Sequence, residues 1–210
     1  MKWAVFGAGA QGRLTAEGVA LAHPGAEVVR LDDRAPDAFP RSWLLAREAI
    51  AEWRVLVAIG RNDVRLRIAS ELQSAGARFG VLVFPTAFVS PSASLGPGAV
   101  VFPGAVVNGG AAVGAHAIIN TRAVVEHDAT IEDGVSLSPG AVSGGRVIVR
   151  RGAFVGVGAV LCPRVEVGEG AIIGAGAVVT RNVPPGVVAY GNPARVVRPV
   201  DVARDWKRLL

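Results

Sequence analysis

The chain has 210 residues, of which 51% are hydrophobic and only 6% aromatic, and its mean hydropathy is +0.42. Glycine, proline or a charged residue interrupts every long apolar stretch, so none reaches the roughly 20 apolar residues of a membrane-spanning helix. The short apolar start runs into glycines, unlike a signal peptide. A single cysteine, Cys162, excludes an internal disulfide. We therefore expect a cytoplasmic protein without membrane insertion.

The formal net charge of +5 is spread along the chain, with +2 up to Phe84 and +3 after it. Proteins that bind nucleic acids need clustered positive charge, and this sequence has neither a basic run nor interleaved aromatic residues. The charge distribution therefore argues against a nucleic-acid partner, whereas anionic small molecules remain possible partners.

Residues 1–84 predict a Rossmann-like α/β domain, because strand and helix patterns alternate as in a small parallel sheet. We expect strands over residues 2–6, 27–31, 54–59 and 79–84, and helices over residues 12–22 and 63–75. A further helix over residues 42–53 fits between the second and third strands, with Leu44, Leu45, Ala49 and Trp53 near one stripe.

The first predicted strand leads into a glycine-rich turn, and two aspartates follow the second strand. Glycines let backbone N–H groups approach phosphates, and carboxylates at that place hold ribose hydroxyls or a base edge. The domain is too short for two mononucleotide halves, so a nucleotide-sugar is favoured over NAD. The residues expected to hold it are Gly9, Gln11, Gly12, Asp32, Asp33 and Gly60.

From Val89 onward the sequence repeats every six residues. Fifteen of the sixteen positions at this interval up to Val179 are aliphatic, Ser143 being the exception, and all sixteen positions four residues later are Ala or Val. A fixed short repeat predicts a solenoid whose turns bury one another. We expect it over residues 85–198, followed by a C-terminal tail over 199–210.

This array, together with the segments Asn120-Thr121, Glu126-His127-Asp128 and Gly191-Asn192-Pro193-Ala194, resembles the hexapeptide-repeat acyltransferases. Within them it is most similar to the UDP-4-amino-sugar N-acetyltransferases and sialic acid O-acetyltransferase-like proteins. The resemblance implies a left-handed parallel β-helix with three hexads in each coil. It also implies acetyl-CoA as co-substrate and a homotrimer with active sites between subunits.

The resemblance assigns His127 as general base, Asp128 as the acid that raises its basicity, and Asn120 to the neighbourhood of the reacting groups. It further implies contacts with acetyl-CoA from Ser136, Val157, Ala175 and Pro193. Many members carry histidine where this chain has Gln11 and Ser136. A zinc site is not expected, because zinc would need three histidines and the solenoid has two.

Residues eighteen apart should stack in neighbouring coils, about 4.8 Å apart. Gly109 and Gly145 would then flank His127, and we expect them to leave room for the pantetheine end of acetyl-CoA and for the acceptor. In the same way, Pro139, Val157, Ala175 and Pro193 follow one another at intervals of eighteen residues. We expect them to stack in successive coils as one column.

The sequence thus predicts acetyl transfer from acetyl-CoA to an amino group of a nucleotide-activated sugar, by direct attack on the thioester. O-acetylation of sialic acid or a related sugar is one alternative. A non-catalytic nucleotide-sugar-binding solenoid is another, and an NAD-dependent oxidoreductase ranks last.

Overall fold

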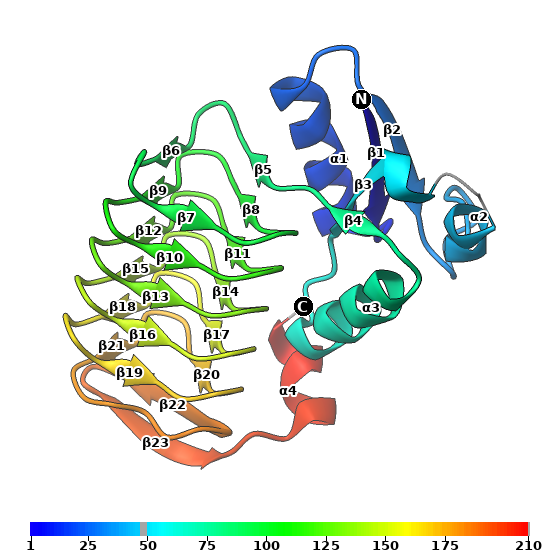
Figure 1. Cartoon of the computed structure of the whole chain (residues 1–210). Coiled ribbons are helices and arrows are strands. Elements are labelled where there is room, and N and C mark those ends of the chain that lie inside the picture. Colours follow the sequence, from blue (N-terminus) through cyan, green and yellow to red (C-terminus); the bar gives the residue numbers. More distant parts are fainter. Residues whose placement is uncertain (47–49, 210) are drawn as a thin grey trace.

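The computed structural model describes residues 1–46 and 50–209. Its N-terminal part is a four-stranded parallel sheet in the order β2-β1-β3-β4 (Figure 1). The strands are β1 (Lys2–Phe6), β2 (Glu27–Leu31), β3 (Trp53–Val57) and β4 (Arg78–Phe79), and the two long helices are α1 (Ala10–Ala22) and α3 (Asn62–Ser74). The expected Rossmann-like alternation is confirmed, with β1 and β2 at the predicted bounds.

The helix predicted over residues 42–53 is wrong in extent. A short helix, α2 (Arg41–Leu45), and a 3₁₀ turn, η1 (Ile50–Glu52), occupy part of this range. Residues 47–49, including Ala49 of the expected stripe, lie outside the described residues. Trp53 belongs to β3, where it pairs with Lys2 and is 1% exposed. Its ring packs edge-on against Trp43 of α2 at 5.5 Å, so it is buried between the sheet and that helix and is not part of a helical stripe.

The strand predicted over residues 79–84 is divided between the two parts of the chain. β4 ends in the first sheet, whereas β5 (Leu82–Val83) pairs with β8 (Val100–Val101) in the solenoid. Between them, Gly80 donates its N–H to the Val55 carbonyl at 3.1 Å, and a Cβ there would lie 2.2 Å from the ring of Trp3. Solenoid pairing therefore begins three residues before the predicted boundary at 85.

Between residues 82 and 191, all of which the structure describes, eighteen strands from β5 to β22 form a parallel β-helix of three sheets. Sheet B contains β5, β8, β11 (Ile118–Ile119), β14 (Ser136–Leu137), β17 (Phe154–Val155), β20 (Ile172–Ile173) and β22 (Val187–Gly191). Sheet C contains β6 (Phe88–Val89), β9 (Val106–Val107), β12 (Val124–Val125), β15 (Val142–Ser143), β18 (Val160–Leu161) and β21 (Val178–Val179). Sheet D contains β7 (Ser94–Leu95), β10 (Ala112–Val113), β13 (Thr130–Ile131), β16 (Ile148–Val149) and β19 (Glu166–Val167).

The interior of the β-helix is the narrow apolar core that the repeat predicts. The aliphatic and Ala or Val positions of the hexads pack into one continuous cluster of buried side chains. Ser143 is the polar exception and is fully buried opposite Val125. Its hydroxyl accepts a hydrogen bond from the backbone N–H of Glu126 at 3.3 Å, which satisfies the buried polar group.

The N-terminal domain covers sheet B. Outward side chains of this sheet, such as Val100 and Ile118, form a shared core with Trp3, Leu56 and Phe84. A Cβ on Gly18 of α1 would lie 2.1 Å from the ring of Phe84, so only glycine lets the helix pack this closely. The two parts therefore meet through an apolar interface.

One arginine of α3 is buried in that interface. Arg65 is 1% exposed and donates hydrogen bonds to the carbonyl oxygens of Ile59 (2.7 Å), Gly134 (2.8 Å) and His116 (2.9 Å), and to Oγ of Ser136 (3.1 Å). Burial lowers the pKa of Arg65 to about 9, so the side chain is still a cation at neutral pH. This cation joins the helix to two successive coils of the solenoid, at the edge where sheet D leads into sheet B.

The predicted C-terminal tail is structured. β23 (Ala194–Pro199) pairs antiparallel with β22, and helix α4 (Val202–Leu209) follows it. Trp206 is 6% exposed and packs edge-on against Phe154 at 5.6 Å, while the buried carboxylate of Asp205 accepts hydrogen bonds of 2.7 and 2.6 Å from Arg198. In the described part of the chain, no helix is both long and apolar enough to cross a bilayer.

Candidate active site

His127 lies at an exposed corner of the β-helix. The turn that carries it links β12 to β13, and we call this edge of the solenoid, where sheet C leads into sheet D, the C/D corner. Nδ1 of His127 is 3.0 Å from Oδ2 of Asp128, and the two side chains are 57% and 50% exposed. The expected histidine–aspartate pair is thus in contact and open to solvent.

Asp128 has a second partner that the sequence analysis did not identify. Nε of Arg146, one coil further on, is 3.5 Å from the same Oδ2 atom. The hydrogen bond from His127, and then the positive charge of Arg146, hold the pKa of Asp128 below its ordinary value. The sequence did contain a signal for this contact. Arg146 follows Asp128 by eighteen residues, the same spacing that predicts Gly145 beside His127.

The pair is arranged as a general base requires. When Nδ1–H donates to the carboxylate, Nε2 carries the lone pair that can accept a proton. A Cβ on Gly145 would lie 2.5 Å from this Nε2 atom, so glycine is needed beneath the imidazole. On the other side, the Gly109 carbonyl accepts a hydrogen bond from the Asp128 N–H at 3.1 Å. The predicted stacking of both glycines about His127 is therefore confirmed.

Asn120 lies at a different corner of the same coil. It follows β11, at the edge where sheet B leads into sheet C, which we call the B/C corner, and β12 separates it from His127. Its Oδ1 atom accepts a hydrogen bond from the backbone N–H of Thr121 at 2.8 Å. Within one chain, the structure does not bring Asn120 beside the imidazole.

The B/C corner also carries two of the residues expected to contact acetyl-CoA. The N–H of Gly158 donates to the Pro139 carbonyl at 3.0 Å, and the N–H of Gly176 donates to the Val157 carbonyl at 2.8 Å, so Val157 and Ala175 stack as predicted. Val157 is 55% exposed.

The expected continuation of this column to Pro193 is wrong. In the last coil Ile172 pairs with Val188, sixteen residues later instead of eighteen, because the final turn is shorter. Pro193 lies beyond this shift, in the exposed turn between β22 and β23.

Ser136, also expected to contact acetyl-CoA, is 6% exposed and lies on the outer side of sheet B. Its hydroxyl donates to Oδ1 of Asn62 at 2.8 Å and accepts a hydrogen bond from Arg65. The structure thus places this hydroxyl in the interface with the N-terminal domain, away from the C/D corner.

The glycine turn of the N-terminal domain has the tight shape that the sequence predicts. A Cβ on Gly12 would lie 1.6 Å from the Gly7 carbonyl oxygen, so no other residue fits. Above Gly9 there is open space, with no atom within 4 Å of a Cβ built there. The side-chain nitrogen of Gln11 is buried and has no hydrogen-bond partner among the described residues. The turn can therefore approach a ligand at Gly9.

The two aspartates after β2 have different partners. Oδ2 of Asp32 accepts a hydrogen bond from the N–H of Ala8 at 2.8 Å. Burial acts to raise the pKa of Asp32, but the hydrogen bonds from Ala8 and from other backbone N–H groups outweigh it and hold the pKa below its ordinary value. Asp33 instead pairs with Nε of Arg41 at 3.0 Å. Gly60, at the start of the turn before α3, is half-buried. These residues surround one end of the sheet, as expected of parallel strands.

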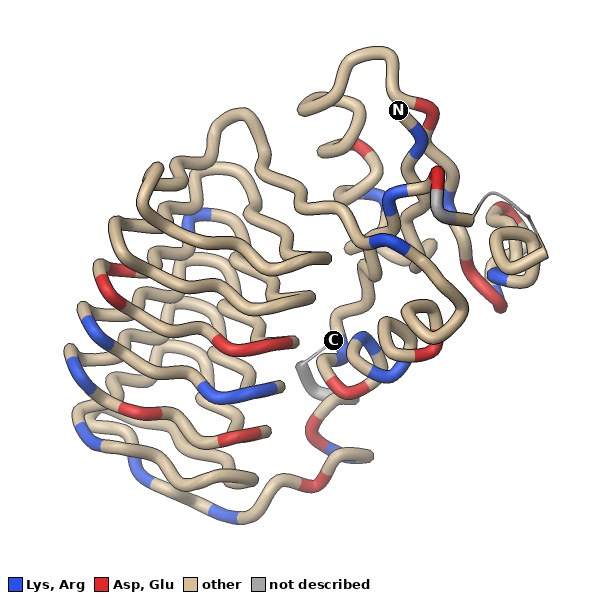
Figure 2. Tube along the Cα trace, in the orientation of Figure 1, with Lys and Arg blue, Asp and Glu red and all other residues tan. Residues whose placement is uncertain are grey.

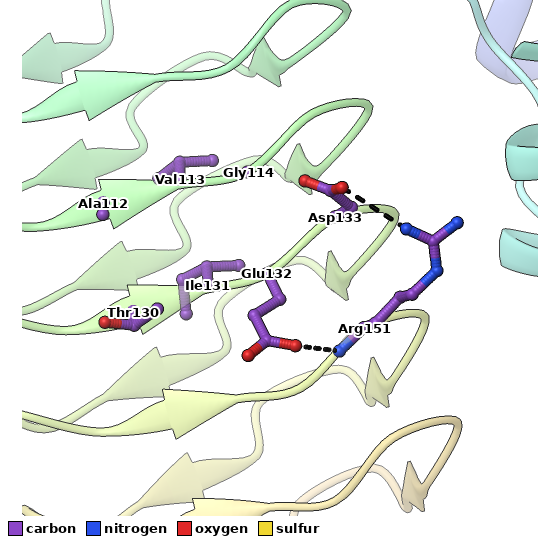
Figure 3. A pocket seen from close by; sticks show the side chains of 8 residues that line it. All are labelled: Ala112, Val113, Gly114, Thr130, Ile131, Glu132, Asp133 and Arg151. Atoms are coloured by element: carbon purple, nitrogen blue, oxygen red, sulfur yellow. Dashed lines mark hydrogen bonds and ion pairs between the residues drawn. The ribbon is translucent and has the colours of Figure 1, made fainter.

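A hollow of about 340 Å³ lies elsewhere, over sheet D (Figure 3). Arg151 beside it donates its backbone N–H to Glu132 at 2.8 Å and its guanidinium to Asp133 at 3.3 Å. Because these groups satisfy one another, the hollow offers few free polar groups to a ligand. Among the described residues, no three His, Cys, Asp or Glu side chains lie together as metal ligands.

The comparisons with known proteins agree with this architecture. The family described as bacterial transferase hexapeptide (six repeats) matches residues 146–181. The acetyltransferase domain of PglB from Neisseria gonorrhoeae is 36% identical, with 93% of this chain and 99% of that chain covered and a TM-score of 0.88; it has also been solved with acetyl coenzyme A. No curated protein sequence matches.

Two other solved structures are similar over almost their whole length. PerB from Caulobacter crescentus, solved in complex with CoA and GDP-perosamine, is 32% identical, with 94% of this chain and 97% of that chain covered and a TM-score of 0.88. WeeI from Acinetobacter baumannii is 26% identical, with 94% and 100% covered and a TM-score of 0.87. The chain therefore belongs to the hexapeptide-repeat sugar acyltransferases. The expected Rossmann-like domain followed by a left-handed parallel β-helix is confirmed.

Proposed function

We propose that this acyltransferase moves the acetyl group of acetyl-CoA to an amino group of a nucleotide-activated sugar. The donor and the acceptor class follow from the similar structures, which hold acetyl coenzyme A or CoA with GDP-perosamine. The single observation that carries the reaction is the His127–Asp128 pair above Gly145, because it offers a hydrogen-bonded base that is exposed to solvent.

In the proposed reaction, the sugar amine attacks the thioester carbonyl carbon while Nε2 of His127 takes the proton that the nitrogen loses. The C–S bond then breaks, and the imidazolium returns the proton to the departing sulfur. The products are the N-acetylated sugar and free CoA, and no enzyme-bound acetyl group is needed. Asp128 orients the ring and stabilises the imidazolium, as a carboxylate on Nδ1 does.

The predicted nucleotide-binding turn and His127 lie on different sides of one chain, since the N-terminal domain covers sheet B and His127 projects from the C/D corner (Figure 1). A nucleotide-sugar held at Gly9 would therefore reach the imidazole of another copy more readily than that of its own chain. This separation supports the prediction of active sites between subunits. It would also give Asn120 a place in the site, if the B/C corner of one copy faces the C/D corner of the next.

Sheet C supplies a surface for this assembly. Its outward residues are all apolar and none is fully buried; they are Phe88, Val106, Val124, Val142, Val160 and Val178. Phe88 is 54% and Val160 39% exposed. An apolar strip of this length marks a contact surface, and we propose that three copies bury it in a homotrimer.

The function is tested by measuring thiol release from acetyl-CoA with a panel of nucleotide-linked amino sugars and free sugars. His127→Ala should lower turnover of the best acceptor by about 10²- to 10⁴-fold, the usual contribution of a general base. His23→Ala, the same change at the end of α1, is the matched control. Normal turnover by His127→Ala would remove this residue as the base.

The panel also separates the alternatives. Acetylation of free sialic acid in preference to nucleotide-linked amino sugars would favour O-acetyl transfer. Binding of acetyl-CoA without thiol release from any acceptor would favour a binding module.

A further inference from the structure

The C/D corner keeps charged side chains at a backbone position that elsewhere favours glycine. Asp128, Arg146 and Arg164 occupy this position in three successive coils, with φ of 58°, 58° and 66°. At each of the other two edges of the solenoid, a single described residue with positive φ is not glycine, namely His116 and Arg122. Side chains other than glycine are strained in this region. The run at the C/D corner therefore indicates that its side chains are needed.

Beyond Arg146, which pairs with Asp128, this corner carries two arginines whose charge is not neutralised by an ion pair, unlike the arginines that follow sheet D. On sheet D, Arg150 is paired with Glu132 at 2.8 Å and with Glu166 at 2.7 Å. Arg164, exposed at the C/D corner, makes no ion pair or side-chain hydrogen bond with any residue that the structure describes, and the same holds for Arg181 in the next coil. Figure 2 shows the resulting basic row along this edge, beyond the acidic residues beside His127.

The row extends from His127 in one direction only. Successive coils are about 4.8 Å apart, so the backbone of Arg164 lies two coils, or about 10 Å, beyond that of Asp128 along the axis, and Arg181 follows. In the opposite direction the corner carries Gly110 and Ser92, which are uncharged. An extended anionic ligand with its reacting group at His127 therefore gains charge complementarity only towards the C-terminal coils.

Acetyl-CoA is such a ligand, because its pantetheine arm separates the thioester from a diphosphate and a 3′-phosphate. We propose that Arg164, assisted by Arg181, binds these phosphate groups and so directs the donor along the C/D corner with its acetyl group at His127. The guanidinium fork suits phosphate oxygens, and charge-assisted hydrogen bonds to them are strong. This assignment rests on the proposed function, which makes acetyl-CoA the donor.

The test compares donors that differ only in their phosphates: acetyl-CoA, its 3′-dephospho form and acetyl-pantetheine. Arg164→Gln keeps a side chain of similar length and removes the charge. We expect the KM for acetyl-CoA to rise about 5- to 10-fold, with kcat at saturating donor and the KM for acetyl-pantetheine unchanged. Arg164→Lys should recover part of the loss. Arg78→Gln, which removes an exposed charge from β4, is the matched control.

Calorimetry with CoA and with pantetheine gives a second measurement that does not depend on turnover. Weaker CoA binding by Arg164→Gln, with equal binding of pantetheine, supports the assignment even if every acceptor fails and the proposed reaction is wrong. An equal loss for acetyl-pantetheine, or no change with any donor, would overturn it. So would a rise confined to the KM for the nucleotide-sugar, since the row would then hold the diphosphate of the acceptor.

Discussion

Replacing Arg65 by methionine should show how strongly one buried cation joins the two parts of the chain. Methionine retains most of the apolar stem but has no donors. It would leave the carbonyl oxygens of Ile59, His116 and Gly134 without the hydrogen bonds of 2.7–2.9 Å that they now accept. Each of these groups would then be buried without its partner.

The expected loss of stability follows from that count. A buried polar group deprived of its partner costs about 1–3 kcal/mol, which for three carbonyls gives about 3–9 kcal/mol. Part of this is offset, because the variant no longer desolvates a guanidinium, a cost of several kcal/mol. We therefore expect Arg65→Met to lower the free energy of unfolding by about 3 kcal/mol or more. For a chain of this size, that corresponds to a fall in Tm of at least about 6 °C.

The assay is urea unfolding and thermal unfolding of Arg65→Met beside Arg67→Met. Arg67 lies on the same helix and pairs with Glu71, but its side chain is 58% exposed. Exposed pairs of this kind contribute about 0.3–0.5 kcal/mol, so the control should hardly change. If the two variants unfold within about 0.5 kcal/mol of each other, the buried network does not stabilise the interface and the reasoning is refuted.

Three further outcomes are expected. Gly145→Leu should lower turnover by at least about 10²-fold without changing the assembly, because its Cβ would lie 2.5 Å from Nε2 of His127; unchanged kinetics would contradict this. Asp205→Asn should weaken docking of α4 by about 1–3 kcal/mol, seen in Trp206 fluorescence and Tm. The pKa of Asp205 is held down by Arg198, so its contribution to stability is present above its ordinary pKa and declines progressively as the pH falls below that value; a difference in Tm between the parent chain and Asp205→Asn that stays constant from pH 5 to pH 2 would refute this. Val160→Glu on sheet C should yield monomers by light scattering and abolish transfer, whereas Thr130→Glu on sheet D should leave the assembly intact; a stable trimer of the first variant would exclude sheet C as the interface.

The repeating part of the fold could be predicted from the sequence because every coil meets the same environment. Each hexad puts an aliphatic side chain and an Ala or Val into the same narrow interior, so the pattern fixes strand positions and stacking together. That is why the positions of Gly145 and Val157 relative to their neighbours are right. The prediction for Pro193 fails where the period changes, since the last turn is two residues shorter.

Contacts that do not repeat left no such pattern. An arginine on an amphipathic helix is usually solvated, and two of the three carbonyl groups that hold Arg65 belong to residues 51 and 69 positions away. Backbone carbonyls carry no signal in the side-chain sequence. In the same way, nothing in residues 199–210 alone indicates that Trp206 meets Phe154, about fifty residues earlier. Long-range partners of this kind require the fold before they can be recognised.

Two outer faces of the β-helix are apolar, and the buried polar contacts explain which one the N-terminal domain covers. The outward row of sheet B runs Val100, Ile118, Ser136, Phe154 and Ile172, with serine as its one polar member. That serine pairs with Asn62 and Arg65, which have no such partner along the uniformly apolar row of sheet C. Docking on sheet C would bury the Arg65 cation without these acceptors, at a cost of several kcal/mol. Apolar burial alone would favour docking on either face, and the buried polar cluster assigns sheet B to the chain's own domain. Sheet C, beside His127, is the face that we propose for contact with another copy.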